Sequence, residues 1–265
     1  TEITMANMLP KIELGNTGFS LGRFGLGGFH QVEISSEIVH QVVDTFQEVG
    51  GNYIETARGY GQGASEIKLG RALRGRRDQF VLCSKSGAER SDDIRRDLEI
   101  TLDNLQTDHI EFYYLHGVPD MDKLDTITGA DGALAGLLKA KDEGLIKGIG
   151  FSSHRLPMYI EALNRLPLSL ILIWSNYLED MHFPEISRDI FPLAKQKGVG
   201  ITSMKPLADG FLYRSATNAI RWSLGSGGDV LICGTNSPAH VREVADAVCA
   251  GPFDEAEREE TLKNA

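Results

Sequence analysis

The sequence has few cysteines, no long apolar run and no excess of basic residues. Cys83, Cys233 and Cys249 lack the spacing of metal ligands, so no metal site is expected and the thiols fit a reducing compartment. No stretch approaches the roughly 20 apolar residues that a membrane span needs, and residues 1–10 do not resemble a signal peptide. We therefore expect a cytoplasmic protein. The net charge of -10 argues against nucleic-acid and anionic-membrane partners, because both would be repelled.

Two further absences bear on the fold. No proline- or serine-rich linker interrupts the chain, which predicts a single domain over residues 1–265. No strand-like run is followed by Gly-x-Gly-x-x-Gly and a helix, although residues 22–28 are rich in glycine. This absence disfavours a doubly wound open sheet, which is the main competing arrangement.

Short apolar runs alternate with helical patterns from end to end. The runs are nearly unbroken, which is typical of parallel strands buried on both faces. Between them apolar residues recur at helical spacing, as at Ile94, Leu98, Leu102 and Leu105. The eight expected strands are 24–28, 52–56, 80–85, 109–116, 146–152, 168–176, 200–205 and 229–234. Eight such units predict an α/β fold, a single closed (β/α)8 TIM barrel.

The two ends of the chain fall outside this repeat. Residues 11–22, with a turn at 16–18, predict an N-terminal β-hairpin ahead of a barrel over 24–250. The acidic tail at 251–265 is either a final surface helix or the start of a further segment. Ser91 and Ser237 precede helical patterns and are expected N-caps, the second with Pro238 at the first helical position.

Several of the expected strands end in polar residues, at the end of a barrel where enzymes of this fold place their active sites. Glu55 lies at the end of the second strand, next to its last residue, and Tyr60 follows that strand; Lys85 closes the third strand and His116 the fourth. A phenol, an ammonium and an imidazole held together can protonate a carbonyl oxygen. Each also has an interpretation without catalysis. Tyr60 lies between two turn glycines and could be a loop tyrosine, and Lys85 and His116 could be solvent-exposed residues at the rim of the barrel.

Eight short segments together resemble the aldo-keto reductase superfamily over about residues 11–250. They are LGNTG at 14–18, ETARGYG at 55–61, GASE at 63–66, LGRAL at 69–73, LQTD at 105–108, LHG at 115–117, GIGFSS at 148–153 and MKPL at 204–207. The sequences at 57–60 and 151–154 are similar to those of a subgroup that often carries a C-terminal iron-sulfur segment. Residues 1–265 contain no such segment, so the protein either lacks it or carries it beyond residue 265.

The resemblance implies a catalytic set of Tyr60, Lys85, His116 and Glu55. Tyr60 would donate the proton, Lys85 would lower the pKa of the phenol, and His116 would orient the carbonyl. Glu55 stands where the family has aspartate, and we assign it the role of compensating the charge of Lys85. Its extra methylene is the largest departure from the family pattern.

The resemblance also implies a nicotinamide cofactor, NADP by family habit with NAD as the alternative. The serine pair at 152–153 would hold the carboxamide, and the helix start after residue 234 would receive the adenosine phosphate. Arg242 would help there if its side chain turned inward. The implied contacts are Gly28, Phe29, Ser152, Ser153, Asn176, Met204, Lys205, Pro206, Leu207, Gly234, Thr235, Asn236, Ser237, His240 and Glu243.

The sequence therefore predicts an NAD(P)H-dependent reductase that converts an aldehyde or ketone to an alcohol. The expected partner is a small carbonyl or alcohol, with no nucleic acid, membrane or metal. The alternative is a non-catalytic dinucleotide-binding redox sensor or partner subunit, which the departures at Glu55 and Ser153 favour. The acidic loop at 118–131 either overhangs the pocket, which would disfavour anionic substrates, or is an ordinary solvated loop.

Overall fold

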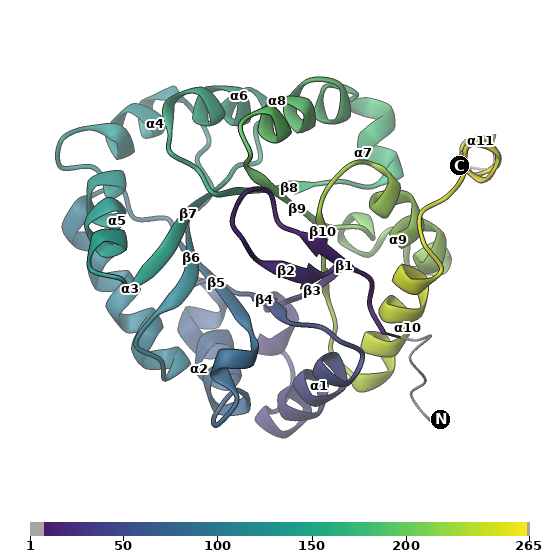
Figure 1. Cartoon of the computed structure of the whole chain (residues 1–265), viewed down its shortest axis with the longest axis horizontal. Helices are drawn as coiled ribbons and strands as arrows, with labels where there is room; N and C mark the ends of the chain where they lie inside the picture. The colour runs from purple at the N-terminus through teal and green to yellow at the C-terminus, as the bar shows by residue number, and fades with distance from the viewer. Residues whose placement is uncertain (1–7, 264–265) are drawn as a thin grey trace.

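Eight parallel strands close into a barrel in the computed structural model, which describes residues 8–263 (Figure 1). The strands follow one another around the barrel in chain order, and β10 pairs with β3 to complete the closure. This confirms the predicted (β/α)8 barrel. The strands are β3 Phe24–Gly27, β4 Tyr53–Glu55, β5 Val81–Ser86, β6 Ile110–Leu115, β7 Ile146–Ser152, β8 Leu170–Trp174, β9 Gly200–Met204 and β10 Val230–Gly234.

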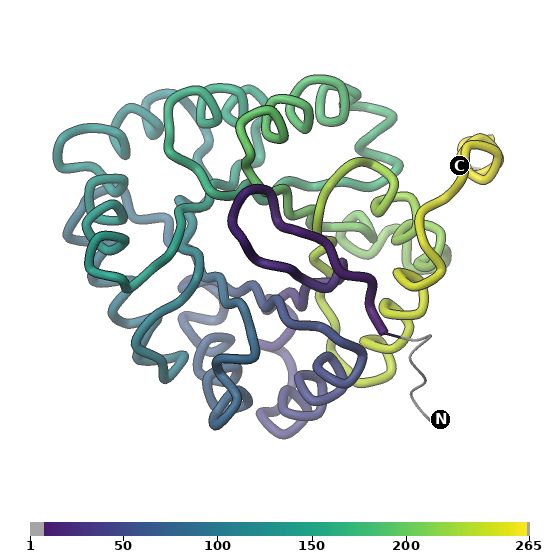
Figure 2. The backbone as a smooth tube through the Cα atoms, viewed as in Figure 1, coloured from purple at the N-terminus to yellow at the C-terminus, as the bar shows by residue number. Residues whose placement is uncertain are grey.

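The helices before α11 surround the barrel (Figure 2), and their buried apolar residues form the core with those of the strands. In α3, Ile94 and Leu98 are fully buried, as their spacing predicts. None of the helices within residues 8–263 is long and apolar enough to cross a membrane. The helices are α1 Ser36–Glu48, α2 Ala64–Ala72, α3 Ser91–Leu105, α4 Met121–Thr128, α5 Ala133–Asp142, α6 Leu156–Arg165, α7 Tyr177–His182, α8 Phe191–Gln196, α9 Ala216–Gly225, α10 Pro238–Cys249 and α11 Glu255–Lys263.

The predicted N-terminal hairpin is present and closes one end of the barrel. Strand β1 (Lys11–Glu13) pairs antiparallel with β2 (Ser20–Gly22), and the hairpin lies across the barrel axis in Figure 1. Leu14 and Leu21 pack into the barrel interior. Gly15 has φ +46°, and an added Cβ would collide with the backbone of Gly200 where β9 begins. Because the hairpin fills the N-terminal ends of the strands, the C-terminal ends remain for a site.

Of the two predicted N-caps, the structure confirms Ser237 and contradicts Ser91. Ser237 caps α10 by accepting a hydrogen bond from the His240 N–H (3.2 Å), as expected. The Ser91 prediction was wrong, because Ser91 is the first residue of α3 and the capping position is Arg90. The Ser91 N–H donates to the Asp131 carbonyl at 2.9 Å, and Arg90 makes no side-chain capping bond.

The acidic segments also differ from a simple loop. Residues 118–131 hold helix α4, capped by Asp120, and none of them lines the main cavity described below, so the predicted overhang was wrong. Residues 255–263 form α11, whose side chains are not buried. In the described part of the tail, the surface-helix interpretation therefore holds.

Candidate active site

A cavity of about 610 Å³ opens at the C-terminal end of the barrel. Its wall contains residues from seven of the strands and from the segments that follow strands. The predicted site residues that line it are Gly28, Phe29, Glu55, Tyr60, Lys85, His116, Ser152, Met204, Lys205, Pro206, Leu207 and Gly234. The structure thus brings together the four candidate catalytic residues and much of the predicted cofactor set.

Lys85 contacts the other candidate catalytic residues Glu55 and Tyr60 and is 1 % exposed. Its Nζ forms an ion pair with Glu55 and donates to the Thr56 carbonyl at 2.7 Å. The ammonium lies 4.8 Å from the centre of the Tyr60 ring. Burial acts to lower the pKa of Lys85, but the charge of Glu55 and the contact with Tyr60 outweigh it and raise the pKa above its ordinary value of 10.5. Lys85 is therefore a permanent cation at neutral pH.

Helix α2 holds the strands that carry this cluster. Ser65 donates to the Gly28 carbonyl (2.7 Å) and bonds to the Thr56 hydroxyl (2.8 Å). Its neighbour Glu66, fully buried, accepts a hydrogen bond from the hydroxyl of Ser84, which precedes Lys85 in β5 (2.7 Å). The sequence identifies residues 63–66 only as part of a family resemblance. It does not predict that Ser65 and Glu66 form hydrogen bonds with the strand ends that carry the cluster.

The Tyr60 ring stands edge-on to two other rings of the wall. Its centre is 5.2 Å from that of Phe29 and 6.4 Å from that of His116, at near-perpendicular angles. Burial raises the pKa of Tyr60 above 10.0, although Lys85 acts in the opposite direction. The expected lowering by Lys85 is present but smaller than the effect of burial. The phenol therefore keeps its proton at neutral pH, as a proton donor must.

His116 is neutral for a related reason. Burial, and then the nearby charge of Lys85, lower the pKa of His116 from 6.5 to about 3. A neutral imidazole donates through one ring nitrogen and accepts through the other. His116 can therefore offer a hydrogen bond to a substrate oxygen without carrying charge.

We expect His116 to remain unprotonated from pH 8 down to pH 5. The measurement is an NMR titration of the imidazole C–H signals, with His116→Gln to assign the resonance. Because the pKa is lower in the folded chain than its ordinary 6.5, the unfolded chain takes up the proton first as pH falls. His116 thus has no effect on pH-dependent stability above about pH 6.5 and reduces stability progressively toward pH 3. A titration midpoint near 6.5 would contradict this.

Two predicted cofactor contacts are engaged elsewhere and do not line the cavity. The Ser153 hydroxyl donates to the Val118 carbonyl at 2.6 Å. Asn176 caps α7 by accepting from the Glu179 N–H (3.1 Å), and its amide donates to the Lys205 carbonyl (3.0 Å). Polar residues that follow strands can bind a cofactor or form hydrogen bonds with nearby backbone groups. Here the side chains of Ser153 and Asn176 both form hydrogen bonds with backbone groups.

The residues predicted to bind the adenosine phosphate of the cofactor also lie outside the cavity, whose lining extends along the chain only to Gly234. Arg242 does not turn inward, because its guanidinium pairs with Glu48 of α1 at 2.8 Å. The volume is within the range of roughly 300–1,000 Å³ usual for small-molecule sites. The predicted contacts beyond Gly234 that do not line it are Thr235, Asn236, Ser237, His240 and Glu243.

Sequence reasoning missed part of the wall. His154 stacks on Trp174, with ring centres 5.8 Å apart, and Asp209 pairs with Lys205. His154 stands in a loop and Asp209 in a short 3-10 turn over Ala208–Gly210, and neither setting has a periodicity that marks a side chain pointing into a site. The wall residues missed are Gly27, His30, His154, Leu172, Asp209, Gly210, Ile232 and Cys233.

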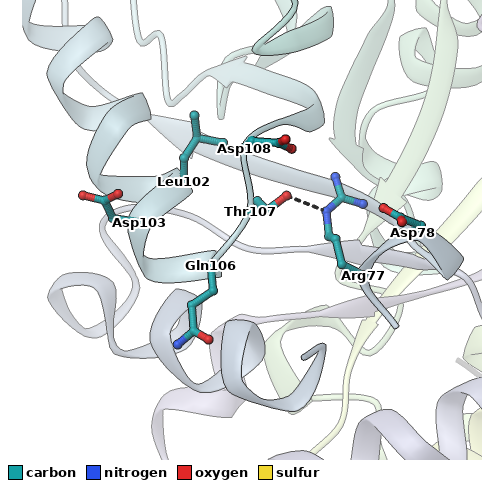
Figure 3. A pocket seen from close by; sticks show the side chains of 7 residues that line it. All are labelled: Arg77, Asp78, Leu102, Asp103, Gln106, Thr107 and Asp108. Atoms are coloured by element: carbon teal, nitrogen blue, oxygen red, sulfur yellow. Dashed lines mark hydrogen bonds between the residues drawn. The ribbon is translucent and has the colours of Figure 1, made fainter. Parts of the chain in front are cut away.

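A second hollow of about 560 Å³ lies at the opposite end of the barrel (Figure 3). It is formed by the segments that lead into β5 and β6. Arg77, its central cation, donates to the Thr107 hydroxyl (3.1 Å) and to Glu111 (3.1 Å), so its charge is already compensated. Across residues 8–263, no group of three or more His, Cys, Asp or Glu side chains could hold a metal ion.

The sequence model of the Aldo/keto reductase family matches residues 20–219. The chain is 27% identical over 220 residues to an L-galactose dehydrogenase of Arabidopsis thaliana, which covers 77% of this chain and 68% of that protein. It is also 27% identical over 227 residues to a probable aldo-keto reductase of Glycine max, covering 79% of this chain and 62% of the relative.

Solved structures share the whole fold. An aldo-keto reductase from Bacillus halodurans superposes with a TM-score of 0.82 at 24% identity, covering 97% of this chain and 96% of that one. One from Klebsiella pneumoniae in complex with NADPH has a TM-score of 0.75 at 22% identity, with coverage of 96% and 94%. These similarities establish the barrel architecture.

Proposed function

The chain belongs to the aldo/keto reductase family of NAD(P)-dependent oxidoreductases, and we propose that it reduces an aldehyde or ketone to an alcohol with NADPH. The observation that carries the proposal is the convergence of Tyr60, Lys85 and His116 on one cavity wall. These side chains supply a proton, a positive charge and a hydrogen bond where a carbonyl oxygen is to be reduced.

In the proposed mechanism, the His116 imidazole donates a hydrogen bond that holds the carbonyl oxygen beside the Tyr60 hydroxyl. When bound, the nicotinamide supplies the hydride that the carbonyl carbon accepts. Tyr60 transfers its phenolic proton to the oxygen, and the Lys85 ammonium stabilises the phenolate that this leaves. In alcohol oxidation the same groups act in reverse, with Tyr60 as the base.

The cofactor contacts we propose are Ser152, Met204, Lys205 and Gly234, which line the same cavity. Met204 offers a polarizable apolar face to the nicotinamide, and Ser152 offers a hydroxyl to its carboxamide. NADPH is proposed over NADH because the aldo-keto reductase from Klebsiella pneumoniae, which shares the fold, is in complex with NADPH. The substrate we propose is uncharged, because the wall's two lysines are each paired with a carboxylate.

Shortening Glu55 to aspartate is expected to leave turnover intact or to raise it. The longer side chain reaches Lys85 with one carboxylate oxygen, while the other is buried without a hydrogen-bond partner. The shorter side chain keeps the charge and places one methylene less beside the lysine. The measurement is kcat for Glu55→Asp, with Glu55→Gln as the control that removes the charge. A loss above about tenfold in Glu55→Asp would refute the support role, given the sensitivity of catalysis to about 1 Å.

The test of the function begins with titration of NADPH and NADH by fluorescence. A panel of uncharged aldehydes and ketones is then screened for NADPH oxidation. We expect binding of NADPH and its oxidation with at least one carbonyl. Binding without oxidation across the panel would favour the alternative, a non-catalytic redox sensor or partner subunit, and no binding of either dinucleotide would refute both.

A further inference from the structure

One side of the cavity is built by residues 205–210, here called the wall segment. Lys205, Leu207 and Asp209 of this segment line the cavity. The segment directly follows β9, and the amide of Asn176 holds its first carbonyl at 3.0 Å. The side chains of Lys205, Leu207 and Asp209 therefore face a ligand that enters the cavity.

The wall segment has a backbone that residues other than glycine seldom adopt. Lys205, Ala208 and Asp209 have φ of 58°, 46° and 55°, in the left-handed region. This conformation costs free energy for a side chain with a Cβ, so contacts must hold it. One such contact joins its two ends, because Lys205 Nζ donates to Asp209 Oδ2 at 2.8 Å.

The same contact determines the charge that the cavity presents. Among the described residues on its wall, the lysines and carboxylates are Lys85, Glu55, Lys205 and Asp209, and no arginine is present. Lys85 forms a buried ion pair with Glu55, so Lys205 is the other lysine of the wall that can bind an anion. Asp209 already neutralises it. The wall is therefore balanced in charge, although a nicotinamide dinucleotide carries a negative charge on each of its phosphates.

We propose that Asp209 weakens dinucleotide binding by occupying Lys205, so that Asp209 sets how tightly the cofactor is held and how readily it is released. The inference rests on the proposed function, in which Lys205 contacts the cofactor. A phosphate entering the cavity must take Lys205 away from Asp209 and then lies near the freed carboxylate. Because both side chains are partly exposed, separating the pair costs a modest amount of free energy, which weakens dinucleotide binding without preventing it.

Replacing the carboxylate by its neutral amide tests this. In Asp209→Asn, we expect the dissociation constant for NADPH, measured by fluorescence titration at low salt, to fall by about 3- to 10-fold. The difference should shrink as salt is raised, because exposed charges are screened. Asparagine tolerates the left-handed backbone at least as well as aspartate, so the fold should be retained, which circular dichroism checks.

Two further variants complete the experiment. Asp189→Asn removes another exposed carboxylate that pairs with an arginine, Arg188, outside the cavity, and it should leave the dissociation constant unchanged within about twofold. In a Lys205→Met background, the gain from Asp209→Asn should shrink, because the pair no longer exists.

Equal or weaker NADPH binding by Asp209→Asn would overturn the inference. So would an equal gain with and without Lys205. Failure of the wild-type protein to bind NADPH or NADH would overturn the proposed function and this inference with it. Binding that is tight and unaffected by Asp209→Asn would overturn the inference alone.

Discussion

Replacing Tyr60 by phenylalanine is expected to lower kcat for carbonyl reduction by about 10²- to 10⁴-fold, the range that a general acid supplies. The substitution removes the hydroxyl and keeps the ring that packs edge-on to Phe29 and His116. NADPH binding should therefore stay within about twofold of the wild-type value. The measurement pairs steady-state kinetics with fluorescence titration.

The matched control is Tyr213→Phe, which removes a phenolic hydroxyl from an exposed tyrosine outside the cavity. Its turnover should equal that of the wild type. Retention of more than about a third of wild-type kcat by Tyr60→Phe would show that another group donates the proton.

Replacing Lys85 by methionine is expected to abolish turnover and to lower the free energy of unfolding by about 3–5 kcal/mol, the usual cost of breaking a buried ion pair. Lys85 and Glu55 are both buried, so the substitution leaves a carboxylate without its cation. Urea unfolding measures the stability, and NADPH oxidation measures the activity.

A second substitution separates stability from chemistry. In Lys85→Met with Glu55→Gln, no charge is left uncompensated, and much of the lost stability should return. Turnover should not return, because no ammonium remains to stabilise the phenolate of Tyr60. An active double variant, or a single variant as stable as the wild type, would contradict the role assigned to Lys85.

The barrel was predictable because burial on both faces leaves an unbroken apolar run for each strand. Strand β7 begins and ends where the sequence predicts, at Ile146 and Ser152. Strand β8 was predicted too long at both ends. At its far end Asn176 leaves the strand to cap α7, and polarity alone does not distinguish a strand end from a helix cap.

Some site residues could be predicted from the sequence and others could not. Glu55 and Lys85 lie within strands, so the fold itself aims them at the cavity. Asp209 stands in a segment with left-handed residues other than glycine, which local sequence preferences do not foresee. Ser153 was assigned to the cofactor, whereas its hydroxyl meets the Val118 carbonyl, a partner distant in sequence.

The central claim is that Tyr60, Lys85 and His116 surround the reacting end of a bound nicotinamide. A crystal structure of the complex with NADPH tests it most directly. The account predicts a nicotinamide ring in the 610 Å³ cavity, with the Tyr60 hydroxyl beside the carbon that gives up hydride. A dinucleotide bound elsewhere, or a nicotinamide facing away from these three side chains, would contradict it.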